Sequence, residues 1–209
     1  MNAKTNQQEK AQRFRQLHSG PGILVLPNAW DAAGARLFEE AGFPAVGTTS
    51  AGLANALGYP DGEAVPRDEM LFVVRRIVQT VETPVTVDIE AGFGKSVDDV
   101  VQTVREVLAA GAVGVNLEDR AQEGEALAGI QEQTEKIEAL RRLANDEACQ
   151  LSSTPERTHS IRPLLFPLAW KRRSSEGERI VRPVRTVCLC HLLQTLRRFR
   201  HWHRASTDR

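Results

Sequence analysis

The stretch from Val85 to Gly94, V-T-V-D-I-E-A-G-F-G, decides the fold that we predict for this chain. Its apolar, β-branched start predicts a strand that ends near Glu90, and the glycines after it permit a sharp turn. Residues i and i+2 of a strand lie on one face, so we expect Asp88 and Glu90 to project side by side. Two converging carboxylates repel unless a proton or a cation lies between them, and Mg²⁺ prefers oxygen ligands. The simpler alternative is an acidic strand end that faces solvent.

The same order of elements recurs on both sides of this stretch. Short apolar runs that predict strands begin near residues 23, 45, 85 and 114. Between and after them, apolar residues recur at helical spacing, up to a helix predicted over 130–143. Alternating strands and helices indicate a parallel sheet covered by helices. The predicted fold class is therefore α/β of the (β/α)8 TIM-barrel type, with only the first four βα units recognisable, because a closed barrel needs about 250 residues.

Polar side chains follow the end of each predicted strand. In parallel barrels the chemistry lies at the carboxyl ends of the strands, so these side chains predict a single site. The alternative is that they cap the helices that follow, which accounts for some of them but less readily for four successive strand ends. The side chains are those of Asn28 and Asp31, Thr48 to Ser50, Asp88 and Glu90, and Glu118 and Asp119.

Three segments make the chain similar to a known family. They are LPNAWDAAGARLFEEAGFPAVGTTSAGLANALGYPDGE (26–63), VDIEAGFG (87–94) and VGVNLED (113–119). In order and spacing they resemble the isocitrate lyase / phosphoenolpyruvate mutase family, and the likeness runs over about residues 12–147. The resemblance implies a (β/α)8 barrel and an enzyme that makes or breaks a C–C or P–C bond next to a 2-oxo acid or its enolate. It also implies Mg²⁺ as cofactor, with Mn²⁺ as a possible substitute.

The resemblance also assigns substrate contacts. Thr49, Ser50 and Ala51 would present backbone N–H groups to the carboxylate of the substrate, and Asp88 would contact the substrate near the metal. The expected partner is accordingly a small-molecule carboxylate.

Metal and catalytic positions follow from the same resemblance. Asp88 would be the nearest ligand of Mg²⁺, while Glu90 and Glu118, together with Asp61, would hold the ion through water molecules. Asp61 lies in a loop that would close over the site, and the resemblance makes Asp61 and Glu118 the catalytic candidates.

One departure from the family bears on the substrate. The lyases of the family carry a Lys-Arg-Cys-Gly-His-type loop after the fourth strand, whereas residues 120–125 read R-A-Q-E-G-E. The general acid of an ordinary isocitrate or methylisocitrate lyase is therefore missing, and those substrates are disfavoured. Bond cleavage, P–C rearrangement, hydrolysis and decarboxylation stay open. The second acid, often Asp in the family, is Glu90 here.

The composition changes abruptly after residue 150. Residues 1–150 carry 14 basic and 23 acidic side chains, whereas residues 151–209 carry 13 and 4, and 14 of the 15 glycines precede residue 150. Such a split between halves asks for an explanation. We expect residues 1–148 to form the N-terminal half of a barrel. Residues 149–209 are predicted to be an aberrant basic tail, irregular or disordered, that is not a domain.

A shift of reading frame would explain this tail. The family carries an I-N-A-R-T-D motif at the fifth strand, and its Arg binds the substrate. Residues 152–158, S-S-T-P-E-R-T, can be encoded TCA-TCA-ACG-CCC-GAA-CGG-ACN. Read from the third base, this gives ATC-AAC-GCC-CGA-ACG-GAC, which encodes that motif. The chain would then be a truncated, non-catalytic remnant with an exposed edge on its fourth strand.

The charge balance, the cysteine count and the lack of long apolar runs disfavour several protein classes. The 27 basic and 27 acidic residues balance, and the cysteines at 149, 188 and 190 are too few for a disulfide scaffold. The N-terminus lacks the apolar segment of a signal peptide, and no run approaches the ~18 apolar residues of a membrane span. We expect a cytoplasmic protein without a membrane partner, from a family that is typically homo-oligomeric. The basic run 197–204 favours adventitious polyanion binding rather than a selected nucleic-acid partner.

Overall fold

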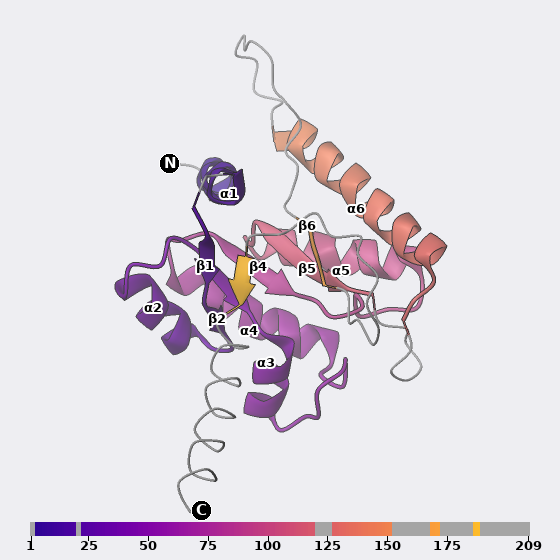
Figure 1. Ribbon diagram of the computed structural model, residues 1–209, viewed down its shortest axis with the longest axis horizontal. Coiled ribbons are helices and arrows are strands. Elements are labelled where there is room, and N and C mark those ends of the chain that lie inside the picture. Colours follow the sequence, from indigo (N-terminus) through magenta and orange to yellow (C-terminus); the bar gives the residue numbers. More distant parts are fainter. Residues whose placement is uncertain (1–2, 20–21, 120–126, 152–167, 172–185, 189–209) are drawn as a thin grey trace, which may run out of the picture.

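The computed structural model describes residues 3–19, 22–119, 127–151, 168–171 and 186–188 (Figure 1). Strands and helices alternate through most of this part of the chain. None of the described helices is long and apolar enough to cross a membrane. In chain order the elements are α1 (Ala3–Ser19), β1 (Leu24–Leu26), β2 (Asn28–Ala29), α2 (Ala32–Glu40), β3 (Val46–Thr48), α3 (Ser50–Leu57), α4 (Arg67–Thr80), β4 (Val85–Asp88), α5 (Val97–Ala109), β5 (Gly114–Glu118), α6 (Ile130–Leu151), β6 (Leu168–Lys171) and β7 (Thr186–Cys188).

The strands form one parallel sheet of five and one parallel pair. The five lie in the order β2-β3-β4-β5-β6, and β1 pairs with β7 (Figure 1). Every pairing is parallel and neighbours follow the order of the chain, as in the wall of a barrel. The predicted α/β class is confirmed. The register aligns Asp88 with Asn116, so the carboxyl ends of β4 and β5 lie at the same edge.

Pro27 separates the first predicted strand, observed as β1, from a second short strand, β2, that follows it directly. Pro27 has no backbone N–H and therefore cannot donate to a ladder. Its carbonyl oxygen still accepts a 2.8 Å hydrogen bond from the N–H of Gly47. The residues before Pro27 pair with β7 and those after it pair with β3, so a single run contributes to two ladders.

The outer edge of β5 is covered, so the prediction of an exposed edge on the fourth predicted strand is wrong. The backbone of β6 pairs with β5 from Val115↔Leu168 to Glu118↔Lys171. Within the segment predicted to be a basic tail, the structure describes two short strands, β6 and β7. The physical reason is that an unpaired edge offers backbone N–H and C=O groups, which an extended segment of almost any side-chain composition can satisfy.

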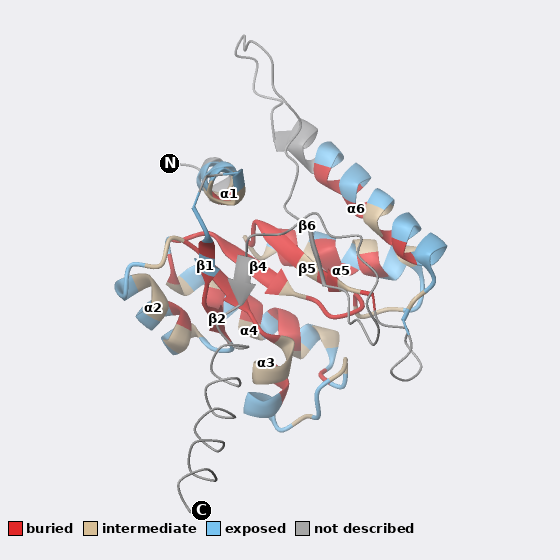
Figure 2. Cartoon of the chain, in the orientation of Figure 1, coloured by how far each residue is buried: buried red, intermediate tan, exposed pale blue. Residues whose placement is uncertain are grey.

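Most of the core lies between the strands and one layer of helices. Buried side chains gather on the strands and on the helix faces turned toward them, while the far face of α6 is exposed (Figure 2). Val46, Val87 and Leu117 belong to this main cluster. A second cluster joins Phe14 of α1 to Leu24 on β1, with neighbours that include Leu26, Ala45 and Val113.

The last helix is longer than predicted. It was expected to end at Leu143 and reaches Leu151. The last helix continues because neither glycine nor proline interrupts residues 130–154, and both residues are strong helix breakers. Its buried apolar side chains, Leu140, Leu143 and Ala144, carry the apolar face up to the predicted end and just beyond it.

Candidate active site

Asp88 and Glu118 lie on the same face of the sheet at the carboxyl ends of adjacent strands. Val87 and Leu117 pack into the main cluster, so the alternating residues, Asp88 and Glu118, face the other side. The backbone N–H of Glu118 donates to the carbonyl oxygen of Glu90 at 2.6 Å, which ties the end of β5 to the segment after β4. Two of the predicted metal positions thus share one face, as the strand-end argument requires.

The carboxylate of Asp88 is held by the start of α3. Its Oδ2 accepts hydrogen bonds from the hydroxyl of Ser50 at 3.0 Å and from the Ser50 N–H at 3.3 Å. The backbone N–H of Asp88 donates to Oγ1 of Thr48 at 2.9 Å. These bonds orient a half-buried carboxylate before any ligand arrives, which is the preorganisation that a metal or substrate site needs.

Asn28 extends this arrangement to the first strand end. Its Nδ2 donates to the carbonyl oxygen of Thr48 at 3.0 Å, and the side chain is buried. Its Oδ1 has no hydrogen-bond partner among the described residues. The strand ends at Asn28, Thr48 and Asp88 are therefore joined by hydrogen bonds, as the order of polar residues in the sequence suggested.

Glu90 does not project beside Asp88 from a strand, and that prediction is wrong. Strand β4 ends at Asp88, and Glu90 adopts a left-handed backbone with φ of 48°. The rule that residues i and i+2 share a face holds only inside a strand. The two residues are linked in another way, because the N–H of Glu90 donates to Oδ1 of Asp88 at 3.2 Å.

The pKa of Glu90 is raised to about 7, and burial is the largest cause. The hydrogen bond from the Glu63 N–H opposes this rise, while the negative charges of Asp88, Asp61 and Glu63 contribute to it. The Glu90 side chain is 3% exposed, although a free glutamate in water is ionised at neutral pH. Burial and the neighbouring acids both oppose ionisation of Glu90, and a cation bound among these carboxylates would offset their mutual repulsion.

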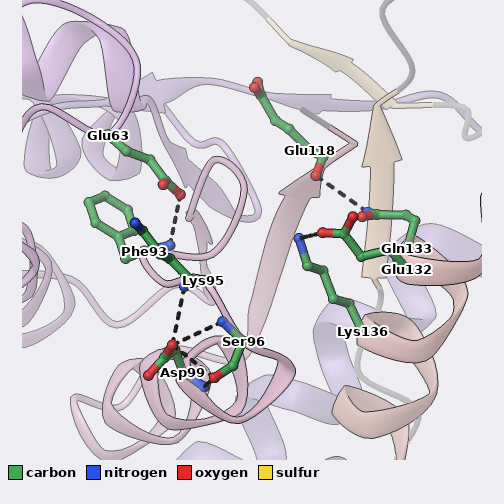
Figure 3. A network of polar contacts seen from close by, with 9 residues as sticks. All are labelled: Glu63, Phe93, Lys95, Ser96, Asp99, Glu118, Glu132, Gln133 and Lys136. Carbon is green, nitrogen blue, oxygen red and sulfur yellow. Dashed lines mark hydrogen bonds and ion pairs between the residues drawn. The ribbon is translucent and has the colours of Figure 1, made fainter. Parts of the chain in front are cut away.

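Glu63 connects Glu90 to the loop after β4 and was not singled out from the sequence. Its backbone N–H donates to Oε2 of Glu90 at 2.7 Å. Its own Oε1 accepts from the N–H of Phe93, also at 2.7 Å (Figure 3). Glu63 and Phe93 both have φ of 57°, in the left-handed region that non-glycine residues rarely adopt. No local signal predicts these bonds, because they depend on two loops that meet only in the folded chain.

Helix capping accounts for part of the polar set. The side chain of Asp31 accepts from Gly34 N–H at 2.6 Å and caps α2, and the hydroxyl of Thr49 accepts from Gly52 N–H at 3.3 Å and caps α3. The Thr49 N–H also donates to the carbonyl oxygen of Ala29 at 3.2 Å. The segment Thr49–Ala51 was predicted to bind the substrate's carboxylate. Within it, Ser50 is the residue that bonds to a site residue, Asp88, and Ala51 follows in the first turn of α3.

Side chains of α6 support the end of β5. Nε2 of Gln133 donates to the carbonyl oxygen of Glu118 at 3.3 Å, and the Glu118 side chain extends away from α6 (Figure 3). Lys136 is 1% exposed and forms a 2.9 Å ion pair with Glu132. The sequence did not indicate these contacts, because a lysine in an amphipathic helix is normally expected on the exposed face.

The donor chemistry fits a hard divalent cation, although the described residues include no group of three or more His, Cys, Asp or Glu already arranged around one point. Asp61 is exposed, and Asp88, Glu90 and Glu118 offer carboxylate oxygens only.

Several segments discussed from the sequence lie outside the described residues. They are the altered loop at 120–125, the out-of-frame motif at 152–158, the basic run 197–204, Cys190 and most of the tail.

A parallel α/β fold with acids gathered at the carboxyl ends of its strands defines a barrel-type enzyme class. Comparison with protein families makes this specific. Residues 14–154 match the family described as Phosphoenolpyruvate phosphomutase, and the chain belongs to that family. The resemblance drawn from the sequence motifs is confirmed.

Relatives in this family include lyases, a mutase and a hydrolase. A 2-methylisocitrate lyase of Bacillus subtilis (strain 168) is 34% identical over 151 residues, which are 69% of this chain and 50% of that protein. A crystal structure from Burkholderia cenocepacia J2315, described as a phosphonomutase, is 41% identical with a TM-score of 0.65 and covers 66% of this chain and 56% of its own. A phosphonopyruvate hydrolase in complex with oxalate and Mg²⁺ is 28% identical with a TM-score of 0.61, covering 64% and 48%. The chain spans about half the length of the curated relatives that it matches.

Proposed function

We propose that this chain carries the metal-binding half of an active site that makes or breaks a C–C or P–C bond beside a small 2-oxo acid. The observation that carries the proposal is the double hydrogen bond from Ser50 to Asp88, on the face that Asp88 shares with Glu118. It fixes a carboxylate at the place where barrel enzymes carry out their chemistry. Family membership supports the reaction class.

Asp88, Glu90 and Glu118 would hold Mg²⁺, for which Mn²⁺ could substitute. Their oxygens are the ligands that this ion prefers, and the hydrolase relative was solved with oxalate and Mg²⁺. When bound, the ion would supply Lewis-acid stabilisation of the negative charge of an enolate.

The remaining groups of the chain would orient the substrate. The backbone N–H groups of the segment Thr49–Ala51 lie at the start of α3, where the helix dipole favours a carboxylate. Those of Thr49 and Ser50 donate to Ala29 and Asp88, so a substrate carboxylate would have to share them. Asp61 lies on an exposed loop beside the acids, from which it would cover the bound substrate and hold a proton or a water molecule.

The test is turnover of oxaloacetate and pyruvate by the purified full chain, with Mg²⁺ and with a chelator. Activity should require the ion and should fall by at least about a hundredfold in Asp88→Ala, since removing an electrostatic group of this kind typically costs 10²–10³ in rate. Asp98→Ala is the control, because it removes an acid from the surface of α5. Activity unchanged in Asp88→Ala would refute the metal assignment.

A second candidate is that the chain is a non-catalytic remnant produced by a shift of reading frame near residue 150. The match to the family ends at residue 154, and the chain spans half of its curated relatives. The coding DNA over codons 148–158 should then differ from that of full-length relatives by one inserted or deleted base. An uninterrupted frame shared with close relatives would exclude this candidate, and a cooperative thermal transition of the full chain would weaken it.

A further inference from the structure

We propose that Glu63 is a positioning residue, which clamps the loop that carries Asp61 to the segment that follows β4. The inference rests on the proposed function, because the clamp matters only if the acids around Asp88 bind a cation. Glu63 lies outside the set of residues that the family motifs assign, and it would act through Glu90 and Asp61 rather than on the substrate.

The clamp consists of two hydrogen bonds that join Glu63 to the segment that follows β4. The Glu63 N–H donates to the carboxylate of Glu90 at 2.7 Å. The Glu63 carboxylate accepts from the N–H of Phe93, also at 2.7 Å (Figure 3). One residue therefore contributes its main chain to one contact and its side chain to the other. Hydrogen bonds to carboxylates are stronger than bonds between neutral groups, so the two segments are held firmly.

The backbone at the clamp adopts a conformation that needs such support. Glu63, Glu90 and Phe93 are the non-glycine residues with left-handed φ in the described part of the chain, at 57°, 48° and 57°. A non-glycine residue persists in this region only where its surroundings compensate the cost. All three residues belong to this one network, so the hydrogen bonds and the strained backbone sustain each other.

The position of the clamp connects it to the site. Glu90 also donates its N–H to Asp88, and Asp61 lies two residues before Glu63. Losing the contact to Phe93 would release the loop, and with it the fixed placement of Asp61 relative to Asp88. Outer-shell partners of this kind typically change metal affinity by 10- to 100-fold when they are removed.

The experiment measures the thermal unfolding temperature of the full chain as MgCl₂ is increased. A bound ion raises this temperature by an amount that grows with the logarithm of its concentration relative to Kd, so the titration reports metal binding without any assay of activity. We expect Glu63→Ala to need at least about tenfold more Mg²⁺ than the wild-type chain for the same rise. Glu63→Gln keeps an acceptor oxygen for Phe93 and should stay within about threefold of the wild type.

Glu39→Ala is the matched control, because Oε1 of Glu39 accepts from the N–H groups of Glu82 and Thr83, both at 2.7 Å, at the opposite end of β4. It should lower the unfolding temperature and leave the Mg²⁺ titration unchanged. The proposal is overturned if Glu63→Ala titrates like the wild type, or if Glu63→Gln or Glu39→Ala shifts the titration as far as Glu63→Ala does. A wild-type chain that shows no response to Mg²⁺ refutes the proposed function itself, and the clamp falls with it.

A measurement on the wild-type chain covers the case in which Glu63→Ala does not fold. The amide protons of Glu63 and Phe93 should exchange slowly with solvent, and Mg²⁺ should slow both together. Exchange of either amide at the rate of an unprotected loop would overturn the proposal.

Discussion

Ser50 donates two hydrogen bonds, one from its hydroxyl and one from its backbone, to a single carboxylate oxygen of Asp88. Ser50 begins α3 just after β3, Asp88 ends the neighbouring strand β4, and the two residues are 38 positions apart in the chain. The main-chain bond would survive any substitution other than proline, whereas the hydroxyl bond depends on the side chain. This difference allows the orientation of Asp88 to be weakened without deleting its charge.

Ser50→Ala should weaken binding of Mn²⁺, used as a spectroscopic stand-in for Mg²⁺, by about tenfold, as the loss of an outer-shell hydrogen bond typically does. The measurement is the electron paramagnetic resonance signal of the free ion during titration of the full chain. Ser19→Ala is the control, because the Ser19 hydroxyl donates to the Arg15 carbonyl in α1 and lies far from the site in the sequence. Equal Mn²⁺ affinity in Ser50→Ala and the wild type would show that the hydroxyl does not orient the metal ligand.

Gly92→Ala should destabilise the chain by more than about 1 kcal/mol. Gly92 has φ of 116°, and an added Cβ would lie 2.6 Å from a methyl carbon of Val100, so both backbone and packing oppose the change. Urea unfolding measures the effect. Gly129→Ala is the control, because nothing lies within 4 Å of an added Cβ there and φ is not left-handed, and it should cost less stability than Gly92→Ala.

Asp99→Asn should make the free energy of unfolding less sensitive to acid. The backbone N–H and the hydroxyl of Ser96, with the N–H of Lys95, hold the pKa of Asp99 below its ordinary value in the folded chain. A carboxylate whose pKa is lowered by folding stabilises the chain above the unfolded pKa near 4, and this contribution is lost as the pH falls through the folded pKa. Wild type and variant should therefore differ most near pH 7 and converge below about pH 4.

The check on Asp99 is urea unfolding between pH 7 and pH 3. Asp98→Asn removes a charge from the same turn of α5 and leaves the capping box of Ser96 and Asp99 intact, so its pH dependence should follow that of the wild type. If Asp99→Asn keeps the full acid sensitivity, the capping bonds do not carry the effect.

Glu132→Gln should destabilise the chain by about 1–3 kcal/mol, because it leaves the buried ammonium of Lys136 without its charged partner. Replacing both residues, with Lys136→Met, should recover most of this loss. Thermal and urea unfolding measure both variants. Glu138→Gln breaks the exposed pair with Arg142 and should change stability by less than about 0.5 kcal/mol. Equal effects of Glu132→Gln and Glu138→Gln would mean that Lys136 finds another partner.

The strands and helices could be predicted because their signals are local. The β-branched run of β4 and the periodic apolar face of α5 each identify their element without reference to the rest of the chain. Asp88 and Glu118 could be named as site candidates for a related reason, since a strand end fixes where its last side chain points.

The parts that could not be predicted depend on contacts between distant segments. The left-handed backbone of Glu90 is set by Glu63, which approaches only after β4 and the preceding loop are assembled. The burial of Lys136 needs α6 to pack on its neighbours, and the pairing of β6 with β5 uses backbone groups that carry no sequence signal.

The pairing of β1 with β7 has a consequence for synthesis of the chain. Leu24 aligns with Thr186, so one of the first strands to leave the ribosome acquires its neighbour only when almost the whole chain has been made. Until then the nascent sheet carries an unpaired strand on each side, since β6 also arrives late. Contacts so far apart in sequence close slowly, and open strand edges invite association with other nascent chains during that interval. Chaperone demand and yield on overexpression should therefore depend more on β6 and β7 than on the acids of the site.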